Sequence, residues 1–360
     1  TVKAMQDVLR TIGEATSGTK DVLQTRLLTR LPLNRIPHTV VNNNRERTRI
    51  LSIDMGLKNL AYCVAEVQYS TPTLATTNMD IFSWRRIDLS EAYREYSLSG
   101  DQKSLENEAL MEGRESEDLY TPESLSRMAY WFLNKVLSES HPNVILIERQ
   151  RWRSAGSPTI QQWTVRVNTL EAAMWAILTT LRYEKALQVD WGMKAVDPKR
   201  VGHFWLDGVT PTPPPSGRKK TSVIDAEKDA EDDEEADKEG KRGAQKLSRS
   251  KAEKKAKIQL LRSWLNSDNP STTLSTSNPG TEVFTPNISF TFSERHRVTN
   301  STGYGAEGTR QALLYATDSP SERLERNAYN KAYVKKVDDI TDCFLQAVAW
   351  VAWAVNRRSL

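Results

Sequence analysis

Four acidic residues stand at positions where a sheet protein would end or begin an element. Asp54 and Glu148 each directly follow a strand-like apolar run, and Asp339 and Asp342 lie at the head of the apolar C-terminal segment. A buried carboxylate is costly unless it has a partner or a cation. Carboxylates suit Mg²⁺, and two such ions can activate a water and stabilise a leaving oxygen. We therefore predict a two-metal site for phosphodiester cleavage. Asp54 would bridge both ions, Glu148 and Asp342 would take one each, and Asp339 would complete the shell or orient the water.

Each of these acids also has a simpler structural explanation. Asp54 with Gly56 is typical of a plain turn, Glu148 could pair with an arginine, and Asp338–Asp339 could cap the N-terminus of the last helix. Asp342 lies one turn further in, beyond the reach of capping. Carboxylates three or four residues apart on a helix repel one another unless a cation lies between them. Taken together, the acids favour a metal site.

The net charge of +4 conceals an asymmetry along the chain. Residues 225–239 contain ten acids and two lysines, a charge of −8, so the remainder of the chain carries +12. A body this basic, with clusters such as Arg149–Arg153, fits a polyanionic partner, although ordinary surface lysines would give the same total. The acidic insertion at about 207–250 has the composition of a disordered loop, and we predict no function for it.

The composition limits the class of protein. The 360 residues include 38% hydrophobic residues and ten tryptophans, enough for a globular protein of one to three domains. No apolar stretch reaches the length of a membrane span. Cys63 and Cys343 lie in apolar surroundings, which predicts buried thiols in a soluble protein of a reducing compartment, with neither a disulfide framework nor a zinc site.

Hydrophobic periodicity predicts the elements that must position the acids. Residues 1–35 are predicted to form a small unit of two short helices, followed by a linker over 36–48. The region 49–360 is expected to be one domain with a mixed α/β sheet, because three strands in a row are followed by alternating helix and strand. The expected strands are 50–54, 60–67, 81–87, 144–148 and 187–196, and the expected helices are 124–137, 160–183, 198–205, 251–264 and 337–356. A polar surface excursion is expected over 91–119, and 266–320 receive no assignment.

Several motifs resemble those of known families. Ile50–Gly56, Ile145–Gln150 and Asp338–Asp342 resemble, in order, the acidic motifs of the RuvC-like branch of the ribonuclease H fold. The longer stretch Ile147–Gly156 and the residues around the third motif are similar to the fungal mitochondrial Holliday junction resolvases. Gly18–Leu27 resembles a SAP motif, a two-helix DNA-binding unit that precedes the nuclease core in that family.

The resemblance implies a fold, an activity and site residues. It implies a ribonuclease H-like mixed sheet flanked by helices, with an N-terminal SAP-like unit. It also implies a homodimer that nicks two opposed strands of a four-way DNA junction with Mg²⁺ or Mn²⁺. The location would be mitochondrial, with the transit peptide outside this sequence. The catalytic and metal-binding residues would be Asp54, Glu148, Asp339 and Asp342. The residues expected to contact DNA are Lys20, Arg26, Lys58, Arg149, Gln150, Arg151, Trp152, Arg153, Lys335 and Lys336.

Alternatives remain at this stage. The chain could be a non-catalytic nucleic-acid binder, such as an RNA-splicing cofactor derived from this family, or another nuclease of the same fold that acts on hybrids or flaps. Trp152 could stack on an unpaired base or belong to the core. The helix over 160–183 could form the dimer interface or simply cover the sheet. Lys335 and Lys336 could face the scissile phosphate or be solvated.

Overall fold

The computed structural model describes most of the chain. The described residues are 1–32, 39–41, 45–69, 77–99, 119–150, 161–184, 191–206, 249–266, 269–272, 286–293, 305–314 and 337–360. Half of the residues predicted to contact DNA lie outside these ranges, namely Arg151, Trp152, Arg153, Lys335 and Lys336. The acidic run at 225–239 also lies outside them.

The two predicted N-terminal helices are confirmed. Helix α1 spans Val2–Thr11 and helix α2 spans Lys20–Arg30. Thr1 caps α1, because its side-chain oxygen accepts a hydrogen bond from the N–H of Ala4 at 3.2 Å. Leu9, Ile12 and Leu23 form a small core between the two helices. Three fully buried side chains make a marginal core, so this unit depends on its contacts with the rest of the protein.

A mixed sheet forms the centre of the molecule, as predicted. Strands β2, β3 and β4 are consecutive and antiparallel, whereas β5 is parallel to β2, β6 to β5, and β7 to β4. The strand order is β6-β5-β2-β3-β4-β7, and β1 pairs with the early part of β2. The strands are β1 (Thr39–Val41), β2 (Arg45–Asp54), β3 (Leu60–Tyr69), β4 (Thr77–Ile87), β5 (Val144–Glu148), β6 (Gly192–Val196) and β7 (Ile288–Phe292).

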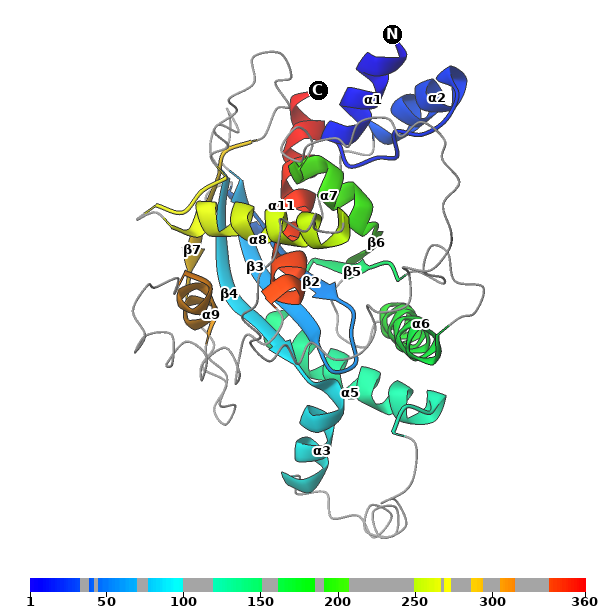
Figure 1. The fold of residues 1–360 in the computed structure, drawn as a ribbon, viewed down its shortest axis with the longest axis vertical. Coiled ribbons are helices and arrows are strands. Elements are labelled where there is room, and N and C mark those ends of the chain that lie inside the picture. Colours follow the sequence, from blue (N-terminus) through cyan, green and yellow to red (C-terminus); the bar gives the residue numbers. More distant parts are fainter. Residues whose placement is uncertain are drawn as a thin grey trace, which may run out of the picture.

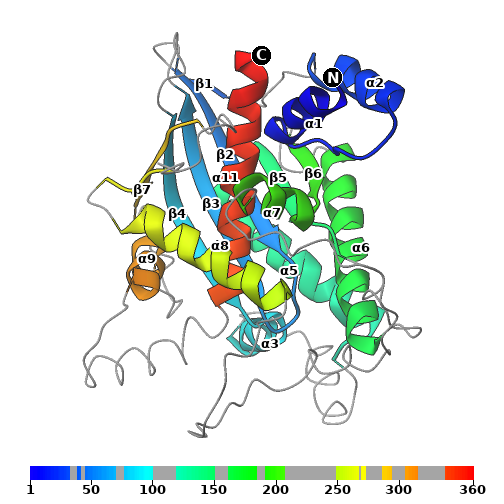
Figure 2. The same cartoon turned by 45° about the horizontal axis from the view of Figure 1, so that its top comes forward.

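Helices cover both faces of this sheet. Figures 1 and 2 show α7, α8 and α11 on one face and α5 and α6 on the other, in agreement with the two hydrophobic clusters. The helices after α2 are α3 (Leu89–Ser99), α5 (Pro122–Ser140), α6 (Gln162–Tyr183), α7 (Pro198–Leu206), α8 (Arg249–Leu265), α9 (Ala306–Leu314) and α11 (Val337–Ser359). Because strand side chains alternate between faces, Ile50 packs toward α11 while Leu51 and Ile53 pack toward α5 and α6.

The structure corrects several sequence-based boundaries. The predicted linker contains β1 and the start of β2, because backbone pairing extends the sheet through polar residues that hydrophobic periodicity overlooks. The predicted polar excursion begins with a helix, α3, whose Leu89 is fully buried. The segment without assignment contributes β7 and α9. β7 has only five residues and pairs with the distant β4, which local sequence does not reveal.

The two cysteines agree with the prediction of buried thiols. Cys63 and Cys343 are free and buried, and burial raises the pKa of both thiols. Of the helices in the described ranges, none has the length and apolar character needed to cross a membrane.

Candidate active site

The parallel pairing of β2 and β5 brings Asp54 and Glu148 next to each other. The register matches Ser52 with Leu146 and Ile53 with Ile147, so the next residue of each strand is one of the predicted acids. Period-two alternation places Asp54 on the same face as Ser52 and Glu148 on the same face as Leu146. This is the face that α11 covers, because the Ser52 hydroxyl donates a hydrogen bond to the Cys343 carbonyl at 2.8 Å.

Buried hydrogen bonds hold α11 in place against these strand ends. The side-chain amide of Gln346 donates to Ser52 Oγ at 3.0 Å and to the Ile53 carbonyl at 3.3 Å. The indole N–H of Trp84 donates to the Ile340 carbonyl at 3.0 Å. Asp342 lies one turn before Gln346, so these contacts hold the acidic start of α11 beside the acidic ends of β2 and β5.

The four predicted acids influence one another electrostatically. Burial raises the pKa of Asp54 well above its usual value, and the neighbouring charges of Glu148, Asp342 and Asp339 raise it further. A hydrogen bond with Glu148 acts in the same direction. Asp54 is 8% exposed, so little solvent screens this repulsion. The structure therefore brings together the four acids that the sequence singled out.

Two lysines of α8 also reach this site, and the sequence analysis did not assign them to it. Lys257 Nζ lies 3.0 Å from Asp342 Oδ1, and Lys254 Nζ lies 2.9 Å from Asp338 Oδ2. Burial raises the pKa of Asp342, and the charge of Lys257 opposes that rise. The sequence does show that the two lysines are three residues apart, which places them on one helix face. It contains no local pattern that predicts contact between that face and α11.

A cleft of about 540 Å³ opens beside the acids. Glu148, Asp339 and Asp342 line it, whereas Asp54 and Asp338 do not. Its other lining residues come from the β2–β3 turn, the residues after β5, the start of α6, the start of α7, and α8. They are Met55, Gly56, Leu57, Lys58, Asn59, Arg149, Gln150, Gln161, Trp163, Thr164, Val167, Asn168, Pro198, Glu253, Lys254 and Lys257. Three residues predicted to contact DNA, Lys58, Arg149 and Gln150, are thus beside the acids.

The other two described residues predicted to contact DNA lie in the N-terminal unit. Lys20 is exposed at the first position of α2. Arg26 donates hydrogen bonds from Nη1 to the backbone carbonyls of Ala15 and Ser17, so it organises the turn between α1 and α2. The structure does not bring Lys20 or Arg26 to the cleft lined by the acids.

The turn after Asp54 is shaped by Gly56. A Cβ atom at this position would lie 2.8 Å from the Asn59 carbonyl oxygen, so the turn excludes any larger residue without a backbone shift. The Asn59 side-chain carbonyl accepts a hydrogen bond from Arg86 Nη1 at 2.6 Å. Burial lowers the pKa of Arg86, and the charge of Asp339 opposes this. Arg86 is therefore a further cation near the acids.

The donor chemistry of the site fits a hard divalent cation. All four predicted ligands are carboxylates, and their repulsion at Asp54 is the kind that a cation relieves. Within the described ranges, no group of three His, Cys, Asp or Glu side chains is arranged to hold a metal ion as it stands. Instead, the ammonium group of Lys257 contacts Asp342. Metal binding would thus require Asp342 to turn from Lys257 or to share its oxygens.

The mixed sheet with helices on both faces is a ribonuclease H-like α/β fold. A family model described as mitochondrial resolvase Ydc2 / RNA splicing MRS1 matches residues 50–360. This match covers most of the chain, and the chain therefore belongs to that family.

The chain is also similar to two individual proteins. The mitochondrial cruciform cutting endonuclease 1 of Schizosaccharomyces pombe is 28% identical over 233 residues, which are 62% of this chain and 76% of that protein. The crystal structure of the yeast mitochondrial Holliday junction resolvase Ydc2 aligns with a TM-score of 0.50 and 18% identity, over 100% of this chain and 95% of that one. The second similarity supports the ribonuclease H-like fold.

Proposed function

We propose that this protein is a metal-dependent endonuclease that resolves four-way DNA junctions. The single observation that carries the proposal is the convergence of four carboxylates at the ends of β2 and β5 and the start of α11. Family membership and the printed activity of the Schizosaccharomyces pombe relative, a cruciform cutting endonuclease, support junction DNA as the substrate.

Each part of the site has a role in this proposal. A divalent cation such as Mg²⁺ or Mn²⁺, bound by Asp54, Glu148, Asp339 and Asp342, would supply positive charge for the scissile phosphate and lower the pKa of the attacking water. Lys58 and Arg149 at the cleft hold the neighbouring phosphates and orient the strand. The buried contacts of α11 with Ser52 keep the carboxylates in position, since small displacements cost large factors in rate.

The proposal extends to assembly and location. A four-way junction has two opposed strands to cut, which a symmetric homodimer with two sites can serve. Helix α6 is our candidate for the dimer interface, because Val165 on it is 50% exposed. The mitochondrial name of the Schizosaccharomyces pombe relative supports a mitochondrial location. The N-terminal unit would act as a SAP-like DNA-binding element.

One alternative has a specific observation behind it. The description of the family includes RNA splicing as well as junction resolution, so a non-catalytic nucleic-acid binder is a second candidate. The presence of all four acids favours catalysis, since a binder has no need to bury repelling carboxylates.

A cleavage assay separates the two candidates. A labelled mobile four-way junction, a matched duplex and a splayed fork are each incubated with the full chain, with Mg²⁺ or with EDTA. We expect paired symmetric nicks on the junction alone, and none in EDTA. Tight junction binding without a cut under any divalent metal would reject the nuclease and favour the binder. Equal cutting of all three substrates would reject junction specificity.

The structure also predicts different roles for two adjacent aspartates. Asp339 lines the cleft, whereas Asp338 pairs with Lys254. We expect Asp339→Asn to lower the cleavage rate by about 100-fold or more, since it removes a carboxylate facing the reacting phosphate. Asp338→Asn should retain most activity and cost at most about 1 kcal/mol of stability, because its lysine partner is 56% exposed. Single-turnover cleavage and thermal melts of both variants test this, and the reverse order of activity would contradict it.

A further inference from the structure

A second hollow lies between the N-terminal helices and α7. Its volume is about 530 Å³, and no acid of the cleft described above lines it. The walls come from α2, from the residues just after α1, and from the first turn of α7. The charged side chains in its lining are Glu14, Asp21, Arg26, Arg30 and Arg200.

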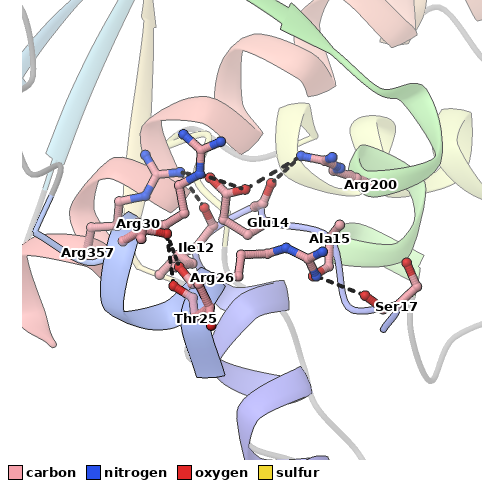
Figure 3. A network of polar contacts seen from close by, with 11 residues as sticks. Ile12, Glu14, Ala15, Ser17, Thr25, Arg26, Arg30, Arg200 and Arg357 are labelled. Atoms are coloured by element: carbon pink, nitrogen blue, oxygen red, sulfur yellow. Dashed lines mark hydrogen bonds and ion pairs between the residues drawn. The ribbon is translucent and has the colours of Figure 1, made fainter. Parts of the chain in front are cut away.

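Glu14 is shared among three guanidinium groups in this region. One carboxylate oxygen lies 3.9 Å from both Arg30 and Arg200, and the other lies 3.6 Å from Arg357 (Figure 3). These distances exceed those of direct hydrogen bonds. Each guanidinium has five N–H donors, so a single carboxylate at this range leaves much of their donor capacity for another acceptor.

Positive charge exceeds negative charge around Glu14. Arg26, Arg30, Arg200 and Arg357 carry +4, and Glu14 and Asp21 carry −2, which leaves +2. Burial lowers the pKa of Arg357, Glu14 raises it, and the like charge of Arg30 lowers it again. An additional anion would relieve this repulsion. The planar fork of arginine matches the oxygens of a phosphate group.

Near the hollow, side chains of α7 and α11 join the N-terminal unit to the body by hydrogen bonds to its backbone carbonyls. Asn356 Nδ2 donates to the Thr11 carbonyl at 2.8 Å, and Arg357 Nη2 donates to the Ile12 carbonyl at 2.6 Å. Arg200 Nη1 donates to the Gly13 carbonyl at 3.3 Å. Gly13 itself has a φ of +74° and leaves no room for a side chain beside Trp353. These contacts hold the segment after α1 against α7 and α11, which limits the relative movement of the two sides of the hollow, as a preorganised site requires.

The hollow is adjacent to the cleft that holds the acids. Pro198, the first residue of α7, lines the cleft, and Arg200, two residues later, lines the hollow. The first turn of one helix thus separates the two depressions. Since a DNA strand carries a phosphate at every nucleotide, a strand with one phosphate in the cleft has others within reach of the hollow.

We propose that this hollow binds a backbone phosphate of the DNA strand that enters the cleft, with Arg30 and Arg200 as its main donors. The N-terminal unit and the catalytic domain then hold one strand together, across their junction. Glu14 keeps the arginines in place in the free protein and limits how tightly they bind phosphate. This inference deepens the proposed function and rests on it for the choice of DNA as the ligand.

Binding measurements in EDTA test the proposal without cleavage. The affinity for a labelled four-way junction is measured against salt concentration for the wild type, Arg30→Gln, Arg200→Gln and the double variant. We expect the double variant to bind about tenfold or more weakly, and the slope of log affinity against log salt to fall by about 1 for each phosphate that the variant no longer binds. Arg94→Gln is the matched control, since Arg94 is exposed on α3, at the far end of the molecule from α1 and α2 in Figures 1 and 2.

A second variant acts in the opposite direction. Glu14→Gln removes the carboxylate that competes with phosphate, so we expect it to tighten junction binding several-fold at low salt while it lowers the melting temperature. If the arginines only brace the N-terminal unit, their variants will lower the melting temperature and leave the salt slope unchanged. Glu14→Gln will then not improve binding. Either result overturns the phosphate site, whereas failure of the wild type to cut any junction overturns only the proposed function.

Discussion

The variant Asp54→Asn is expected to lower junction cleavage by about 1,000-fold or more while it leaves junction binding intact. The negative charges of Glu148, Asp342 and Asp339 all raise the pKa of Asp54. An amide oxygen carries no full negative charge. It therefore binds a divalent cation weakly and does not neutralise the positive charge of that cation. The side chain keeps its size, and the strand β2 that carries it is unaffected. Single-turnover cleavage with Mg²⁺ and binding in EDTA measure the two effects separately.

A buried aspartate elsewhere in the same sheet provides the control. Asp80 of β4 is 6% exposed and accepts hydrogen bonds from the hydroxyl groups of Thr291 and Ser293, both at 3.1 Å. Asp80→Asn should lower stability and retain cleavage, since the residue is in a different part of the sheet from the cleft. Cleavage by Asp54→Asn at a rate near that of the wild type would show that this carboxylate does not take part in the reaction.

Asp54→Asn should also stabilise the metal-free protein at neutral pH. The pKa of Asp54 is raised in the folded state, so the folded protein binds this proton more tightly than the unfolded chain does. Stability therefore falls as the pH rises from the usual pKa of about 4 through the raised value, by about 1.4 kcal/mol per pH unit. Asparagine has no proton to lose and avoids this cost. In EDTA, Asp54→Asn should melt several degrees above the wild type at pH 8 and close to it at pH 4.

Addition of Mg²⁺ should reverse the order of the two melting temperatures, so that the wild type melts above Asp54→Asn. A cation that binds only the folded protein stabilises it in proportion to the logarithm of its concentration. The wild type should gain in melting temperature with Mg²⁺, and Asp54→Asn should gain little. Asp338→Asn is the control, because it removes a neighbouring carboxylate that already has a lysine partner. A wild type that melts above Asp54→Asn in EDTA at pH 8 would contradict the repulsion among the four acids.

The acids could be found from the sequence because local patterns determine where they lie. An apolar run that ends in an acid predicts a carboxylate at a strand end, and parallel pairing then places two such ends together. The start of α11 was identified in the same way, by a helical apolar pattern that begins at two acids.

Contacts between distant segments could not be predicted in this way. The pairing of Lys257 with Asp342 joins residues on two helices whose relative position depends on packing over the sheet. The same is true of Glu14, whose arginine partners come from α2, α7 and α11. β7 was missed because its partner β4 lies some two hundred residues earlier in the chain.

Helix α11 carries two of the four proposed metal-binding acids near one end and binds the N-terminal unit at the other, through Asn356 and Arg357. It also supplies a large part of the core on one face of the sheet. Of the described helices and strands, α11 is the last in chain order. Until α11 docks, the chain has an exposed apolar sheet face, an unattached N-terminal unit and an incomplete set of carboxylates. Docking of this one helix thus completes both the hydrophobic core and the proposed set of metal ligands.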